Sequence, residues 1–310
     1  CSNNYLGLAN NPLVIKAVED AVAKYGWGAG ASRLVSGNMR MHEALEGEIS
    51  RFKEKEASIV FPTGYMANIG TISSLVSKGD LIICDKLNHA SIIDGCRLSG
   101  AEFRVYPHCE MEKLENILKK STKYSRKLIV TDTVFSMDGD IAPLPDIVRI
   151  AHKYKAMVMV DEAHGTGVFG KKGRGVVEHF KLSKKVDIVM GTLSKAVGSL
   201  GGYVSGDTDL INYLRNKARP FMYTTALPPA VCAASIAGIK LIRKDPSLRE
   251  SLWCNVRFLK EKLESLSLKV IPSESPIIPI LIGDAKKAVD VSKFLYKKGI
   301  LIPAIRPPTV

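Results

Sequence analysis

The feature that most constrains the fold of this chain is a regular alternation of strand-like and helix-like segments that begins near residue 57. Short apolar runs rich in β-branched residues recur at Ser58–Phe61, Leu81–Cys84, Phe103–Tyr106, Leu128–Val130, Met157–Val160, Ile188–Met190 and Gly202–Val204. Stretches with a helical spacing of apolar residues separate most of them, for example Met111–Lys120 and Ile147–Tyr154. Strands that alternate with helices in this way build a parallel sheet covered by helices. The sequence therefore predicts an α/β domain with a mainly parallel central sheet.

The pattern changes toward both ends of the chain, and these changes predict three parts. Residues 1–39 are expected to form an N-terminal arm with a helix at Leu13–Tyr25, and residues 40–225 the large domain. Residues 226–310 are expected to form a smaller C-terminal α/β domain. Its expected elements are helices at Pro229–Arg243 and Leu248–Leu266, a strand at Ile277–Ile282, a helix at Ala285–Lys298 and a strand at Ile300–Ile305.

The composition excludes several classes of protein. With 46% hydrophobic and 24% charged residues among 310, the chain is expected to bury a large core rather than to be disordered. Its apolar runs are too short to cross a bilayer and no leader segment is recognisable, so no membrane association is expected and the cytoplasm is the default location. The six cysteines contain no C-x-x-C pair, which argues against a zinc site or a disulfide framework.

The charge balance favours an anionic partner without identifying it. Lys and Arg number 44 against 31 Asp and Glu, a net charge of +13. Nucleic acid, coenzyme A and an acidic carrier protein all suit such a surface. Most lysine clusters fall where helices end or loops begin, and a solvated surface explains them more simply.

Two short patterns suggest nucleotide chemistry, and both are incomplete. Val160-Asp161-Glu162-Ala163-His164 resembles the metal-binding strand end of a helicase. The nearest phosphate loop, Gly165 to Lys172, has Lys where the magnesium-binding Ser or Thr belongs. The same glycines spell G-x-G-x-x-G, but the residues that follow are a poor start for a helix. A nucleic-acid motor and a dinucleotide site are therefore not expected.

Polar side chains converge on one edge of the predicted sheet. Asp161 ends one apolar run, and Lys195 follows the next run 34 residues later, about one strand–helix–strand unit. Both side chains are therefore expected at the carboxyl edge, where open α/β sheets bind ligands. An isolated Lys–Asp pair is more often structural, but other polar groups follow strands at the same edge. These are Thr63-Gly64-Tyr65, His89, Ser136, His164, Thr192 and Ser194.

Taken together, five ordered motifs resemble the α-oxoamine synthases, pyridoxal-phosphate (PLP) enzymes of the aspartate-aminotransferase fold, fold type I. The motifs are Thr63-Gly64-Tyr65-Met66-Ala67-Asn68, Asn88-His89-Ala90-Ser91, Val134-Phe135-Ser136-Met137-Asp138-Gly139-Asp140, Asp161-Glu162-Ala163-His164-Gly165 and Gly191-Thr192-Leu193-Ser194-Lys195. The resemblance runs from Ser2-Asn3-Asn4-Tyr5-Leu6-Gly7-Leu8 to the last residue, so it covers essentially the whole chain.

The resemblance implies a role for each residue near the cofactor ring. Lys195 forms a Schiff base with the cofactor aldehyde. Asp161 pairs with the pyridine nitrogen and keeps the ring an electron sink. His164 bonds the phenolic oxygen, and Ser136 contacts the same region. His89 stacks on the ring and assists proton transfer.

The resemblance also implies a phosphate site shared between two subunits. Gly64, Tyr65 and Thr192 hold the phosphate, and Thr225 reaches it from a second subunit, so a homodimer is expected. Asn3 and Thr309 are expected along the substrate, and no metal is expected.

The end of the chain indicates which reaction of the family to expect. Ala304–Val310 is similar to members that join L-alanine to a pimeloyl thioester of coenzyme A or acyl carrier protein, which gives 8-amino-7-oxononanoate in biotin biosynthesis. The alternative is a glycine C-acetyltransferase, where Ile92–Arg97 fits equally well. Family members normally continue past Val310 to an arginine that binds the amino-acid carboxylate, so the small domain is expected to be truncated.

Other classes and other histidines complete the expectations. An aminotransferase would share Asp161 and Lys195, whereas a non-catalytic PLP-binding protein would not need the intact set of Lys195, Asp161 and His89. His42 is expected to pack structurally or to lie near the active site. Three further histidines, His108, His152 and His179, are expected on the surface without partners.

Overall fold

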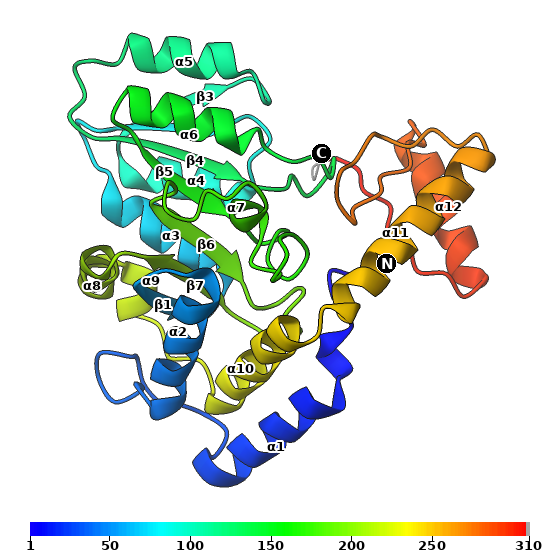
Figure 1. Ribbon diagram of the computed structural model, residues 1–310, viewed down its shortest axis with the longest axis horizontal. Helices are drawn as coiled ribbons and strands as arrows, with labels where there is room; N and C mark the ends of the chain where they lie inside the picture. Colours follow the sequence, from blue (N-terminus) through cyan, green and yellow to red (C-terminus); the bar gives the residue numbers. More distant parts are fainter. Residues whose placement is uncertain (308–310) are drawn as a thin grey trace.

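The computed structural model describes residues 1–307, which are built around a seven-stranded sheet (Figure 1). The strands are β1 (Ala57–Phe61), β2 (Leu81–Asp85), β3 (Glu102–Tyr106), β4 (Lys127–Asp132), β5 (Met157–Asp161), β6 (Ile188–Thr192) and β7 (Gly202–Gly206). Their order is β1-β7-β6-β5-β4-β2-β3. Strands β3, β2, β4, β5 and β6 are parallel, and β7 runs antiparallel to both β6 and β1. The predicted α/β fold with a mainly parallel sheet is confirmed.

Helices cover both faces of this sheet. They are α1 (Pro12–Tyr25), α2 (Arg40–Lys53), α3 (Gly64–Leu75), α4 (Ala90–Ser99), α5 (Met111–Lys119), α6 (Leu144–Lys153), α7 (Val176–His179), α8 (Thr208–Lys217), α9 (Arg219–Met222), α10 (Pro229–Lys244), α11 (Ser247–Ser265) and α12 (Ala285–Lys297), with a 3₁₀ turn η1 (Leu8–Asn10). One buried cluster joins the sheet to α2, α5, α6, α7 and α10, and a second joins it to α3, α4, α8 and α9.

The burial of β2 explains why apolar runs were so informative. All five of its residues are buried. Leu81 and Ile83 belong to the first cluster, whereas Ile82 and Cys84 belong to the second. A strand covered on both faces needs apolar residues at consecutive positions, not at alternate ones. The seven predicted strands therefore coincide with observed strands.

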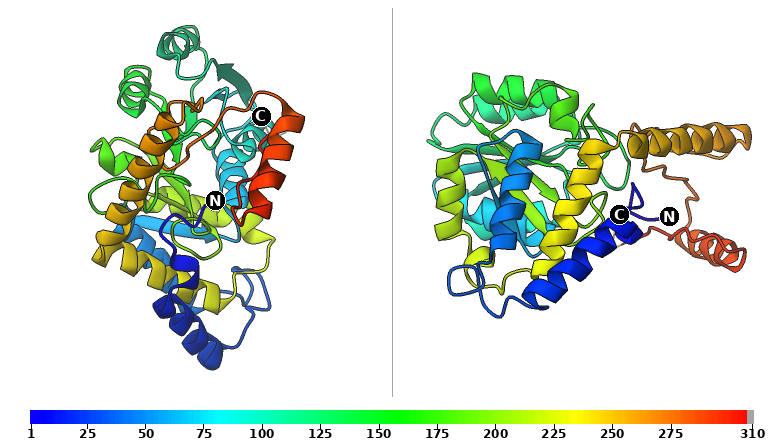
Figure 2. Two further views of the ribbon diagram at one scale, coloured as in Figure 1. Left: turned by 90° about the vertical axis from the view of Figure 1, so that its right-hand side faces the viewer. Right: turned by 60° about the horizontal axis from the view of Figure 1, so that its bottom comes forward.

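The C-terminal part of the chain departs from the prediction. Helix α12 forms as predicted, but it has no buried residue, and it extends away from the sheet together with α11 (Figure 2). The strand predicted at Ile277–Ile282 is wrong, because only one isolated bridge, Val270 to Ile280, forms there. The strand predicted at Ile300–Ile305 is also wrong, because this segment carries no regular element. Both segments have apolar, β-branched residues, but a strand also needs a neighbour to pair with. Ile277–Ile282 pairs with residues 269–271 only through this bridge and two backbone hydrogen bonds, and no ladder forms at Ile300–Ile305.

The N-terminal helix packs on the C-terminal half of the chain. Helix α1 lies along α10, and α10 in turn packs on α2 (Figure 1). Among the described residues, no helix is both long enough and apolar enough to cross a bilayer.

Candidate active site

The candidate site lies at the carboxyl edge of β4, β5 and β6. Asp132 and Asp161 are direct neighbours in the register of β4 and β5, at the last residue of each strand. Thr192 ends β6, and the turn that follows it carries Lys195. Parallel strands bring their carboxyl ends to one edge, so residues far apart in sequence meet here.

Asp161 is held in one orientation by two donors. Its Oδ2 accepts a hydrogen bond from Asn68 Nδ2 at 2.7 Å, and its Oδ1 accepts one from the Ala163 N–H at 2.8 Å. Asn68 lies on α3 and also donates to Ser91 Oγ on α4, while its Oδ1 is buried without a partner among the described residues. Asp161 is 4% exposed. Its carboxylate is therefore held in a fixed orientation and is nearly closed to water.

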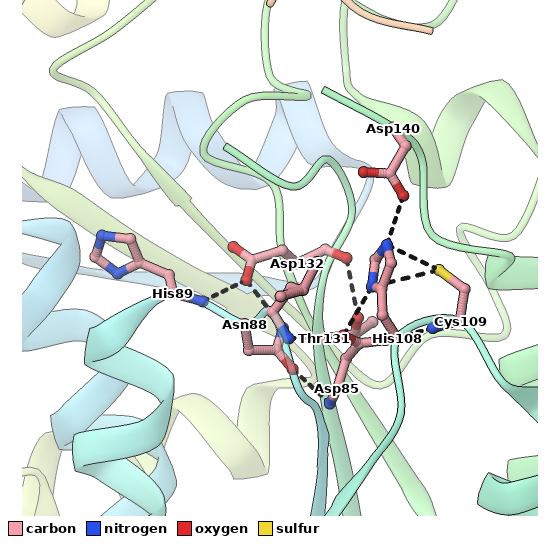
Figure 3. A network of polar contacts seen from close by, with 9 residues as sticks. Asp85, Asn88, His89, His108, Cys109, Thr131, Asp132 and Asp140 are labelled. Carbon is pink, nitrogen blue, oxygen red and sulfur yellow. Dashed lines mark hydrogen bonds and ion pairs between the residues drawn. The ribbon is translucent and has the colours of Figure 1, made fainter. Parts of the chain in front are cut away.

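Asp132 anchors the loop that carries His89 (Figure 3). Its Oδ2 accepts hydrogen bonds from Asn88 Nδ2 at 2.9 Å and from the His89 N–H at 2.8 Å. Burial and the neighbouring Asp161 carboxylate raise the pKa of Asp132 to about 7. His89 caps the N-terminus of α4, and its Nδ1 lies 2.8 Å from Ser91 Oγ, which gives the exposed ring a fixed orientation.

Lys195, His164 and Tyr5 form a chain of three side chains. Lys195 Nζ lies 3.0 Å from His164 Nε2, and Tyr5 Oη lies 2.6 Å from His164 Nδ1. Burial lowers the pKa of Lys195, although the Asp161 and Asp132 carboxylates partly offset this. Burial, together with the charges of Lys195 and His89, lowers the pKa of His164 to about 3. His164 is therefore a neutral imidazole, and burial favours the neutral amine of Lys195.

The N-terminus of α3 provides a cradle for an anion. Thr63 caps the helix by accepting from the Met66 N–H at 3.1 Å, whereas the N–H groups of Gly64 and Tyr65 have no acceptor among residues 1–307. A Cβ at Gly64 would lie 3.1 Å from Met190 Cε and 3.6 Å from Thr192 Oγ1. Free N–H groups and a positive helix end attract phosphate, and the lack of a side chain at Gly64 lets α3 approach β6 closely.

The comparisons with known proteins agree with this geometry. The profile of a family described as aminotransferase class I and II matches residues 1–310. The chain belongs to this family.

Its relatives also narrow the subfamily. The 8-amino-7-oxononanoate synthase of Thermoanaerobacter pseudethanolicus is 51% identical over 310 residues, which cover 100% of this chain and 78% of that protein. The enzyme of the same name from Bacillus pumilus is 52% identical over 309 residues, which cover 100% and 79%. A serine palmitoyltransferase variant from S. paucimobilis, solved with PLP and myriocin bound, matches with a TM-score of 0.96 at 37% identity and covers 100% of this chain and 78% of its own. The predicted resemblance to α-oxoamine synthases of fold type I is confirmed.

The remaining predicted site residues occupy different surroundings. Ser136 lies in the half-buried turn after β4, and Asn3 Oδ1 lies 3.5 Å from Tyr5 Oη. Thr192 Oγ1 donates to the Gly201 carbonyl at 2.9 Å. Thr225 is exposed, and no hydrogen bond in the described part of the chain links it to the group around Lys195. Thr309 lies outside the described residues.

The structure corrects the prediction for His108 and shows the contacts of His42, for which the sequence left two alternatives. His108 is not without partners: its Nδ1 lies 2.9 Å from Asp85 Oδ1, and its Nε2 lies 2.8 Å from Asp140 Oδ2 (Figure 3). Burial alone would lower the pKa of His108, but the two carboxylates raise it above its ordinary value. His42 is a structural residue, because its ring accepts from the Met39 N–H and lies 2.8 Å from the Leu227 carbonyl.

The group around His108 resembles a metal site only in composition. Ligand atoms of Asp85, His108 and Cys109 lie within 4.8 Å of one another. Both ring nitrogens already face a carboxylate, and Cys109 Sγ lies 3.8 and 3.7 Å from Nδ1 and Nε2, beside the ring. A metal must lie along a nitrogen lone pair. The group is therefore an ion-pair bridge between two loops.

Several residues of the site were not identified individually from the sequence. Tyr5, Asn68 and Ser91 each contact a predicted residue directly, and Asn88 contacts Asp132, which was not among the predicted residues. The four residues stand inside quoted motifs, but the roles of Tyr5, Asn68 and Asn88 depend on partners distant in sequence. A polar residue that the fold buries is the signal for such a role, and burial is visible only in the structure.

Proposed function

We propose that the chain is a PLP-dependent acyltransferase that condenses L-alanine with a pimeloyl thioester to give 8-amino-7-oxononanoate, a step of biotin biosynthesis. A carbon–carbon bond forms between the acyl carbonyl and the alanine α-carbon, while carbon dioxide and the free thiol leave. The observation that carries this proposal is the near 50% identity to synthases of this name over the full chain. The site geometry supplies the residues for it.

The residues present fit PLP, the cofactor of the family. Asp161 offers a buried carboxylate for a protonated pyridine nitrogen, and Lys195 a buried amine for the aldehyde. The cradle at Gly64 has free N–H groups for a phosphate. His164 faces the same space and suits the phenolic oxygen. When bound, PLP supplies an electron sink that stabilises negative charge at the substrate α-carbon.

The protein groups themselves bind, orient and move protons. Burial lowers the pKa of Lys195, which favours the neutral amine that can accept a proton from the substrate α-carbon. Asp161, fixed by Asn68 and Ala163, holds its negative charge in place throughout. His89, fixed by Ser91 and by Asp132, presents its ring to the open side of the site.

A second copy of the chain is part of the proposal. Thr225 is exposed beside a surface hollow lined with Leu34, Val35 and Tyr223, and it pairs with Ser32 in an isolated bridge. In a homodimer, Thr225 of the partner subunit would complete the phosphate site. The division into an arm (1–39), a large domain (40–225) and a small domain (226–310) stays a prediction. The proposed second substrate is a thioester of acyl carrier protein or of coenzyme A.

The experiment is a visible absorption spectrum of the protein with PLP, before and after addition of L-alanine or glycine. We expect a band that needs Lys195, is lost in Lys195→Ala and persists in the exposed control Lys184→Ala. A response to L-alanine that exceeds the response to glycine, followed by product formation with pimeloyl thioester, supports the synthase. A preference for glycine and acetyl-coenzyme A would refute this proposal in favour of a glycine C-acetyltransferase. The absence of any band in dimeric protein would refute the assignment of PLP as the cofactor.

A further inference from the structure

Tyr5 is the one member of the three-residue chain at Lys195 that the proposed chemistry does not use. It comes from the N-terminal segment, 159 residues before His164. The Tyr5 and His164 rings meet edge to face, with centroids 6.0 Å apart and an interplanar angle of 64°. Burial raises the pKa of Tyr5, which favours the protonated hydroxyl.

The distances decide which way the hydrogen bonds run. A neutral imidazole has one N–H and one lone pair, so Tyr5 and Lys195 cannot both donate to it. If Nδ1 carried the proton, Tyr5 would have to donate elsewhere, and the nearest acceptor is Asn3 Oδ1 at 3.5 Å. That separation is too long for a good O–H···O bond, whereas 2.6 Å to Nδ1 is short. Tyr5 therefore donates to Nδ1, and the ring proton lies on Nε2.

We infer that Tyr5 is a positioning residue that holds His164 as the Nε2–H tautomer, so that His164 donates toward Lys195 Nζ and favours the neutral amine. A protonated amine has no lone pair to accept this hydrogen bond, and its N–H groups would face the ring N–H. The inference rests on the proposed function only in taking Lys195 as the reacting amine. An N–H at Nε2 is also the donor that an anionic phenolic oxygen requires.

The other charged groups at the site act on Lys195 from different elements. Asp161 on β5 and Asp132 on β4 favour the ammonium form, and burial opposes it. His89 from the start of α4 acts on His164. Removal of the Tyr5 hydroxyl leaves all of these groups in place. Its effect on the Lys195 amine can therefore be separated from theirs.

The direct test is nitrogen-15 NMR of the imidazole side chains in the cofactor-free protein, with His164→Asn used to assign the signal. We expect His164 to be the Nε2–H tautomer in the wild type and to change toward Nδ1–H in Tyr5→Phe. Asn3→Ala should leave the tautomer unchanged, since Tyr5 donates to His164 and not to Asn3. Tyr213→Phe is the matched control, because its hydroxyl donates to the Ser74 carbonyl far from the site.

The second readout is the rate at which Lys195 is acetylated, followed by mass spectrometry across pH. We expect acetylation at pH 7 to be about tenfold slower in Tyr5→Phe, which corresponds to a rise of about one unit in the Lys195 pKa. An Nδ1–H tautomer in the wild type, or an unchanged tautomer and amine pKa in a folded Tyr5→Phe, would overturn the inference. Neither readout needs PLP or substrate, so this result is independent of the spectral test of the proposed function.

Discussion

Removal of the His108 bridge tests whether this histidine holds two loops of the large domain together. In the folded protein, His108 contacts Asp85, which is 1% exposed, and Asp140, whose side chain is 25% exposed. A hydrogen bond between charged groups contributes about 2 kcal/mol when buried and about 1 kcal/mol or less when solvated. Asp85 keeps the N–H groups of Leu87 and Cys109 as donors. We therefore expect His108→Ala to lose about 3 kcal/mol of unfolding free energy at pH 6.

The loss should depend on pH in one direction only. Because the carboxylates raise the pKa of His108, the folded protein binds this proton more tightly than the unfolded chain. Its contribution is complete below about pH 6.5, the ordinary histidine value, and disappears as pH rises through the folded value. At pH 9 a neutral ring can donate only one hydrogen bond, and the difference should shrink to about 1 kcal/mol.

The assay is urea unfolding followed by circular dichroism at pH 6 and pH 9. The control is His152→Ala, because His152 is exposed and has only a 3.3 Å contact to the Lys185 carbonyl. This control should change the unfolding free energy by less than about 0.5 kcal/mol. An equal loss for His108→Ala at both pH values would refute the ion-pair bridge and leave only packing against Phe135 as its role.

Three further predictions concern the site. Asp132→Asn should raise the unfolding free energy of the cofactor-free protein by about 2 kcal/mol at pH 8 and have little effect at pH 4. The pKa of Asp132 is higher in the folded protein than in the unfolded chain, so the ionised carboxyl destabilises the fold at pH values above the unfolded pKa. Urea titrations at both pH values measure the difference. Gly202→Ala should cost more than about 2 kcal/mol and weaken PLP binding, since its Cβ would lie 2.6 Å from Gly64 Cα. The matched control is Gly206→Ala, whose Cβ would meet the flexible Leu210 side chain and, at 3.3 Å, the Asp187 carbonyl oxygen. Thermal melts and PLP titration compare the two variants, and equal losses would contradict the cradle. If the net charge of +13 steers the anionic acyl thioester, raising the salt concentration should increase its apparent KM and leave the apparent KM for L-alanine unchanged. An apparent KM for the thioester that does not change with salt would exclude electrostatic steering.

The sheet could be predicted because a strand that is buried on both faces has a recognisable local sequence. Strands covered on both faces, such as β2 and β5, are short unbroken apolar runs, and the carboxyl-edge rule then places Asp161 and Lys195 together. The same local reasoning was wrong for Ile277–Ile282 and Ile300–Ile305. Their composition suits a strand, but strand formation also depends on a partner that local sequence does not specify.

The polar contacts of the site could not be predicted in the same way. His108 has partners 23 and 32 residues away, one at the end of β2 and one in the loop after β4, and nothing near it in sequence indicates them. The role of Tyr5 likewise depends on His164 and Lys195 lying at the end of different strands. Motif resemblance gave the residues that are expected to face the cofactor, whereas the residues that orient them became visible only through distances.

The position of Tyr5 has a consequence for the order in which the chain folds. Its contact with His164 closes a loop of 159 residues. The entropy cost of closing so long a loop is offset only when the intervening residues have already formed the sheet. Helices such as α10 need no such closure, because their hydrogen bonds are local. In a refolding experiment, the circular dichroism signal should therefore recover before the His164 tautomer does. Secondary structure should form before the contacts of Tyr5, His164 and Lys195.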